Sequence, residues 1–74
     1  MNGQDFVLRG EHITLDALLK ATGLASSGGM AKAMIVGGEV RVDGQVELRR
    51  GAKIRAGQAV LAAGRLWRVQ AETS

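Results

Sequence analysis

The chain has 74 residues, of which 46% are hydrophobic and 23% are charged. This length fits one small domain and excludes a multidomain enzyme, and the composition is typical of a globular rather than a disordered protein. Because there is no cysteine and only one histidine, disulfides, thiolate metal sites and a histidine-rich metal cage are excluded. We therefore expect a single domain over residues 1–74, with its core in 13–60, that folds without a metal or cofactor.

Positive charge is concentrated in the second half of the chain. The formal net charge is +3, and residues 1–38 contribute nothing to it because their three basic and three acidic residues cancel. Five basic residues and two acidic ones lie between Arg41 and Arg55. This asymmetry indicates a surface that faces a polyanion, although a solvated basic strand face has the same composition. No membrane span or signal peptide is indicated, and the lack of cysteine fits a cytoplasmic protein.

The first half of the chain carries the patterns of a terminal strand and a short helix. Phe6–Arg9 is a short apolar run that predicts the strand. Apolar or small residues at positions 15, 18, 19 and 22 share one face of a helix, which Thr14 can cap. Asp16 suits the positive end of the helix dipole, and Gly23 is placed to end the helix in a left-handed turn, after which Leu24 folds back.

A second helix is predicted from Gly28 to Val36. Ser27 is its expected N-cap and Gly37-Gly38 its terminator. Its expected buried face consists of Ala31, Met34 and Ile35.

From Glu39 the period of the hydrophobic pattern changes from 3.6 to 2, which predicts strands. Asp43-Gly44 is a two-residue turn signal, and Gly64-Arg65 is the expected turn of a last hairpin. The predicted strand segments are 39–43, 45–48, 53–55, 59–63 and 66–69. The order of elements predicts an α+β fold in which two short helices pack on a small antiparallel curled sheet.

Catalytic constellations are missing from the sequence. His12 is the only histidine, and its place in a short connector beside Glu11 favours a surface or capping role. Ser26 and Ser27 have no histidine partner for a triad. We therefore expect a protein without catalytic activity.

The start of the second predicted helix is a candidate anion site. Gly28 and Gly29 lower helix propensity by about 1 kcal/mol each relative to alanine, and such local violations often mark functional sites. Their bare amides follow Ser27, and Lys32 lies three to four residues further along the same helix face. The residues alone leave open a glycine-rich loop in which Ser27 is merely a cap.

A second candidate is a strip of basic side chains on the predicted strands. Guanidinium groups suit bidentate phosphate contact, and alternation puts Lys53 and Arg55 on one face while Ile54 points to the core. The aromatic residues are limited to Phe6 and Trp67, and Trp67 is expected to pack rather than stack on a base. Recognition of a nucleic acid through its backbone and shape is therefore favoured. The strip would comprise Arg41, Arg49, Arg50, Lys53 and Arg55.

The spacing of these features resembles the S-four RNA-binding domain, named after a ribosomal small-subunit protein. The residues that carry the resemblance lie between Ile13 and Val60: Ile13-Thr14-Leu15-Asp16-Ala17-Leu18-Leu19, Gly23-Leu24, Ser27, Ala31-Lys32, Ile35, Gly38-Glu39-Val40-Arg41-Val42-Asp43-Gly44 and Lys53-Ile54-Arg55-Ala56-Gly57. The resemblance implies two helices on an antiparallel sheet, with RNA held by the second helix and the adjoining loop and strands. Gly28, Asp43 and Gln58 depart from residues common in the family, where the positions carry a basic residue, an asparagine and an aspartate.

Together these observations predict a cytoplasmic RNA-binding protein that contacts structured ribosomal or transfer RNA, including RNA in the ribosome. The alternative is a protein-interaction module that presents the basic strip or a sheet edge to an acidic partner.

Overall fold

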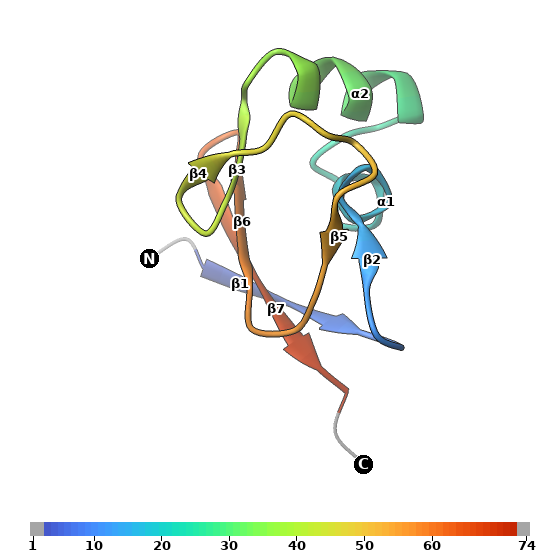
Figure 1. Cartoon of the computed structure of the whole chain (residues 1–74), viewed down its shortest axis with the longest axis vertical. Coiled ribbons are helices and arrows are strands. Elements are labelled where there is room, and N and C mark those ends of the chain that lie inside the picture. The colour runs from blue at the N-terminus through green and yellow to red at the C-terminus, as the bar shows by residue number, and fades with distance from the viewer. Residues whose placement is uncertain (1–2, 73–74) are drawn as a thin grey trace.

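Two helices lie over one face of a strongly twisted sheet, with a short second ladder of strands beside them (Figure 1). The structure, a computed structural model, describes residues 3–72. The elements in chain order are β1 (Gly3–Leu8), β2 (Ile13–Thr14), α1 (Leu15–Ala21), α2 (Gly28–Val36), β3 (Val40–Val42), β4 (Gln45–Val46), β5 (Lys53–Ile54), β6 (Ala59–Ala62) and β7 (Arg65–Ala71). The predicted α+β class with two short helices is confirmed.

The main sheet is mixed rather than antiparallel, which corrects the prediction. Its strand order is β1-β7-β6-β3-β4, and β1 runs parallel to β7 from the Gly3–Leu66 pair to the Leu8–Ala71 pair. Parallel neighbours need a long crossover connection, and here the whole of the intervening chain provides it. The first strand covers Gly3–Leu8 instead of the predicted Phe6–Arg9, because pairing with β7 recruits polar residues that the apolar pattern does not mark.

Both predicted hairpins exist, one of them with a shifted turn. Asp43 and Gly44 have φ values of 52° and 85°, as expected for the two-residue turn between β3 and β4. The last hairpin turns at Ala63-Gly64, with φ values of 53° and 74°, one residue earlier than predicted. In such a turn both central residues have positive φ, so Gly64 supplies the second of them and Ala63 accepts the strain of the first.

β5 pairs with β2 and stands apart from the five-stranded sheet. Ile13 is opposite Ile54 and Thr14 is opposite Lys53, and the contact continues where the Leu15 amide donates to the Ala52 carbonyl at 2.9 Å. The chain before it is less regular than predicted, since β4 contains only Gln45–Val46 of the expected segment 45–48. Residues 47–52 instead form a loop that packs along the start of α1.

The two helices begin in different ways. At α2 the prediction is confirmed at both ends, and the Ser27 hydroxyl accepts a hydrogen bond from the Met30 amide at 3.2 Å. At α1, Thr14 occupies the N-cap position but its side chain makes no capping bond. Gly23 has a φ of 81° after α1, and Leu24 is buried behind it as expected.

The core is made entirely of apolar side chains from the helices, the main sheet and β5. Among residues 3–72 no polar or charged residue is buried. The fully buried large side chains are Leu15, Leu18, Leu19, Ile35, Ile54, Val40, Val60 and Val69. Ala31, Met34 and Ile35 are buried as predicted, which leaves the opposite side of α2 in solvent. The fold thus has one apolar core, and the start of α2 and the outer side of β5 lie on the surface.

Candidate nucleic-acid interface

The first turn of α2 presents backbone amides that are not covered by side chains. Gly28 and Gly29 are exposed, and their amides find no acceptor among residues 3–72. The next amide, that of Met30, is bound to the Ser27 hydroxyl, and the Ala31 amide closes the first helical bond on the Ser27 carbonyl at 3.0 Å. Two free N–H groups at the positive end of the helix dipole can therefore meet an anion.

Lys20 extends from the last turn of α1 to this exposed helix start. Its Nζ lies 4.0 Å from the point that a Cβ on Gly28 would occupy. Lys32, one turn into α2, is exposed on the side of the helix that faces away from the core. We call Ser27, Gly28, Gly29, Lys20 and Lys32 the α2 anion site. Sequence patterns do not identify Lys20 as a site residue, because its approach to Gly28 depends on how α1 packs on α2; the one signal is its place in the last turn of the predicted first helix, three residues before Gly23.

Arg49 is held by an acidic neighbour. Its backbone amide and Nε donate to Glu47 Oε2 at 3.0 and 3.2 Å, and its Nη2 donates to Oε1 at 3.4 Å. The hydrogen bonds from Arg49 keep the pKa of Glu47 below its ordinary value, and the same pair raises the pKa of Arg49. The Arg49 side chain is 81% exposed, so it remains accessible but its charge is offset.

The predicted single basic strip is divided between two surfaces, which corrects the sequence analysis. Lys53 and Arg55 are exposed on and beside β5, whereas Arg41 is exposed on β3, in the other sheet. Arg41 is paired with Leu61 and Val46 and lies on the outer face of the main sheet, since its neighbours Val40 and Val42 point inward. A single continuous strip does not form because β5 pairs with β2 and not with β3.

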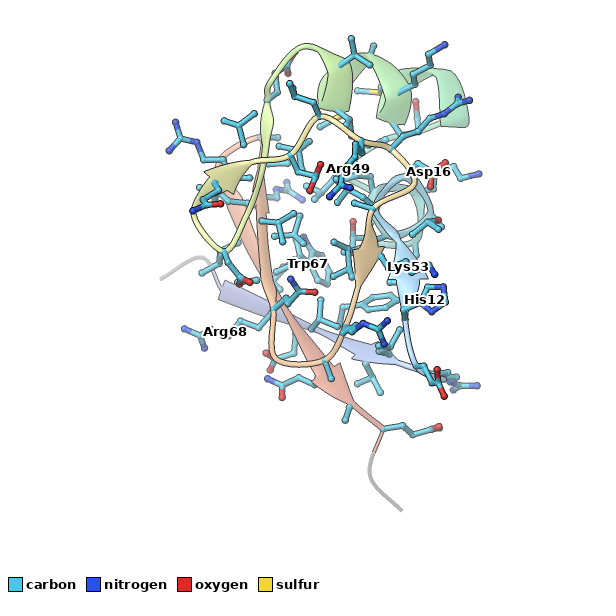
Figure 2. The ribbon with its side chains drawn as sticks, viewed as in Figure 1. His12, Asp16, Arg49, Lys53, Trp67 and Arg68 are labelled. Carbon is cyan, nitrogen blue, oxygen red and sulfur yellow. The ribbon has the colours of Figure 1, made fainter. Side chains whose placement is uncertain are left out.

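Arg50 belongs with the β5 side of this division. Its carbonyl accepts the Asp16 amide at 3.1 Å, which fixes the loop before β5 against the start of α1. Figure 2 shows Arg49 above the β2–β5 ladder and Lys53 on it, while Arg68 points away from them on the opposite side of the molecule. Arg49, Arg50, Lys53 and Arg55 therefore lie on β5 or next to it in the sequence, and Arg41 and Arg68 lie on the main sheet.

A family model described as the S4 domain matches residues 6–70. The chain belongs to the S4 domain family. It is 51% identical over 53 residues to YbcJ of Escherichia coli (strain K12), whose name gives RNA binding as its provisional function; the match covers 72% of this chain and 76% of YbcJ. YbcJ of Shigella flexneri, which is named as uncharacterised, matches to the same extent.

The fold of this S4 domain is also similar to a solved structure. The solution structure of YbcJ from E. coli matches with a TM-score of 0.67 and 41% sequence identity, over 95% of this chain and 87% of that one. That structure is described as revealing an αL motif involved in RNA binding. The resemblance noted in the sequence is therefore confirmed at the level of family and fold.

Two of the departures from the S4 pattern have a structural role here. Asp43 Oδ1 accepts the Ala59 amide at 2.9 Å, and its Oδ2 accepts Gln58 Nε2 at 3.3 Å. Gln58 Oε1 in turn accepts the Arg55 amide at 2.8 Å. The Asp43 carboxylate is thus used to tie the β3–β4 turn to the loop before β6, and it does not face the α2 anion site.

The remaining polar residues singled out in the sequence have surface or packing positions. His12 is exposed, in line with the expected surface position. The Asp16 carboxylate interacts with the Thr14 side chain and accepts the Ala17 amide at 2.9 Å. These bonds keep the pKa of Asp16 below its ordinary value, although burial acts in the opposite direction. Trp67 packs against the core as expected, with its Nε1 buried and without a hydrogen-bond partner.

Residues 3–72 contain no group of three or more histidine, cysteine, aspartate or glutamate side chains placed to hold a metal ion. Neither helix in the described part of the chain has the length and apolar character needed to cross a membrane.

Proposed function

We propose that this S4 domain binds structured RNA by contacting its phosphate backbone. The observation that carries the proposal is the α2 anion site, in which two free glycine amides at a helix N-terminus lie next to the ammonium group of Lys20. Phosphate is the anionic group that RNA presents along its whole length, and helix N-termini with adjacent lysines are suited to it. The similarity to YbcJ, whose name and structure both refer to RNA binding, supports the same ligand.

The proposed interface is centred on Ser27, Gly28, Gly29, Lys20 and Lys32 and extends towards β5. Lys53 and Arg55 supply exposed cations there, Arg50 lies in the adjoining loop, and Arg49 becomes available when phosphate competes with Glu47. Arg41 lies on the outer sheet face, where it can reach only a separate segment of the same RNA. Because the interface has no exposed aromatic ring, we propose recognition of backbone and shape, as found in folded ribosomal or transfer RNA, within the cytoplasm.

The proposal is for binding without catalysis. The one histidine is exposed beside Lys53 on the β2–β5 ladder (Figure 2), and no hydrogen bond joins it to a carboxylate among residues 3–72. The carboxylates of Asp16 and Asp43 are occupied by bonds that hold the fold. These positions offer no pair of groups that would exchange a proton with a bound substrate.

The test is the salt dependence of RNA binding. If Lys20, Lys32, Lys53 and Arg55 each neutralise one phosphate, log affinity should fall against log salt with a slope near −3, from about −0.7 per contact. Binding of a fluorescent folded RNA is measured by anisotropy for the wild type and for a Lys20→Gln/Lys32→Gln variant. The salt dependence of the variant should be less steep by about 1.4. If both proteins bind equally at 1 M salt, the variant therefore binds roughly 25-fold more weakly than the wild type at 0.1 M salt.

A matched control removes the same amount of charge from another part of the surface. Arg65→Gln/Arg68→Gln also lowers the net charge by two, on β7, away from the α2 anion site. Equal losses in the two double variants would mean that only net charge matters, and the proposed interface would be wrong. Absence of a salt-dependent interaction in the wild type would overturn RNA binding itself.

A further inference from the structure

The outward face of the β2–β5 ladder brings the only histidine next to basic residues that are about 40 positions away in the sequence. Ile13 pairs with Ile54 across the ladder, and Thr14 pairs with Lys53. Ile54 is buried and Ile13 is half-buried, so alternation turns Thr14, Lys53 and the preceding His12 to the outer side. Figure 2 shows His12 and Lys53 together on this side of the ladder.

Arg55 completes a small group of nitrogen donors at one end of the ladder. It directly follows β5, as His12 directly precedes β2, so both residues flank the same end of the pairing. His12, Lys53 and Arg55 are all exposed, and none of them forms an ion pair with another described residue. We call His12, Thr14, Lys53 and Arg55 the ladder face.

The charges around His12 come from three elements. Lys53 and Arg55 face it from β5, Glu11 precedes it in the connector, and Asp16 stands at the start of α1 with its carboxylate already bound by Thr14 and Ala17. Further back in the connector, Arg9 is compensated by Glu72, with Nε and Oε2 3.9 Å apart. The ladder face thus carries the two positive charges of Lys53 and Arg55, with the Glu11 carboxylate beside it.

We propose that the ladder face extends this phosphate-contacting interface and that His12 is an RNA-binding residue within it. This inference rests on the proposed function, because it assigns a further residue to the same ligand. The imidazole N–H donates a hydrogen bond to a phosphate oxygen, beside the ammonium of Lys53 and the guanidinium of Arg55.

The experiment measures affinity for one folded RNA in 0.1 M salt, for the wild type, for His12→Ala and for Gln4→Ala as a control on β1. Loss of one hydrogen bond weakens binding by about fivefold. We expect His12→Ala to bind about fivefold more weakly than the wild type. Gln4→Ala, which shortens an exposed side chain of β1, should bind as the wild type does.

A second measurement reads the contact directly. The ring proton signals of His12 should shift in NMR spectra when the RNA is added, and thermal unfolding of His12→Ala should match the wild type. If the wild type binds RNA but His12→Ala binds equally tightly, or if the ring signals do not move, the ladder face is not part of the interface. If the wild type does not bind RNA, the proposed function fails together with this inference.

Discussion

Gly28→Asp separates the contribution of the α2 anion site to stability from its contribution to binding. Gly28 lies in the first turn of α2 and has no positive φ, and a Cβ added to it would meet only Lys20 Nζ, at 4.0 Å. A carboxylate introduced here would interact favourably with the helix dipole and would lie next to the Lys20 ammonium group. The substitution therefore fits the fold and opposes an anionic ligand.

The expected change in stability is a small gain. Replacing glycine in a helix by aspartate recovers a few tenths of a kcal/mol of helix propensity, and a negative charge in the first turn adds about 0.3–1 kcal/mol. The sum is roughly 0.5–1.5 kcal/mol, and for a domain of this size each kcal/mol raises the melting temperature by about 4–8 °C. Differential scanning calorimetry should therefore show a melting temperature a few degrees above that of the wild type.

The expected change in RNA binding has the opposite sign. Pairing of the new carboxylate with Lys20 removes one phosphate contact, which weakens binding by about fivefold at 0.1 M salt, and repulsion between carboxylate and phosphate adds to the loss. Gln4→Glu on β1 lowers the net charge equally and serves as the control, with affinity expected to stay close to that of the wild type. If Gly28→Asp binds as tightly as this control, the amides at the start of α2 do not hold phosphate.

Three further predictions concern other parts of the structure. Glu47→Gln frees Arg49, so RNA binding at 0.1 M salt should tighten by up to about fivefold, and an unchanged anisotropy titration would show that Arg49 faces away from the RNA. Folding lowers the pKa of Asp16, so its contribution to stability is present above the unfolded value near 3.8 and is lost as the pH falls through the lower folded value. In urea unfolding, Asp16→Asn should therefore lose less stability than the wild type when the pH is lowered through this range. Identical pH profiles of the two proteins would contradict this prediction. Leu18→Ala should lower the free energy of unfolding by about 2–5 kcal/mol, and a loss below about 1 kcal/mol would mean that the core adapts to the cavity.

The helices were predictable because their signals are local. In the sequence, Ser27 marks the start of α2 and the Gly37-Gly38 pair marks its end. The spacing of Ala31, Met34 and Ile35 identifies the buried face of this helix. The Asp43-Gly44 turn is likewise determined by two adjacent residues. Each of these features depends on interactions within about four residues, which a pattern can represent.

The strand pairing was not predictable to the same degree because it depends on distant residues. Nothing in Lys53-Ile54 indicates that its partner is Ile13-Thr14 rather than β3, and this choice separates Arg41 from Lys53 and Arg55. The parallel pairing of β1 with β7 joins the two ends of the described chain and has no local signal.

The residues of the candidate site also divide into those with local sequence signals and those that only tertiary packing brings to the site. Ser27, Gly28, Gly29 and Lys32 are contiguous or one helical turn apart, so the sequence brings them together. Lys20 joins them only through the packing of α1 on α2.

The most direct test of the central claim is to observe the amides of Gly28 and Gly29 when RNA binds. In 15N-edited NMR spectra of the protein, titration with a folded RNA should shift these two amide signals strongly and slow their exchange with solvent, with smaller shifts around Lys20 and Lys32. Shifts confined to the outer sheet face around Arg41 and Arg68, with the Gly28 and Gly29 signals unmoved, would contradict the account.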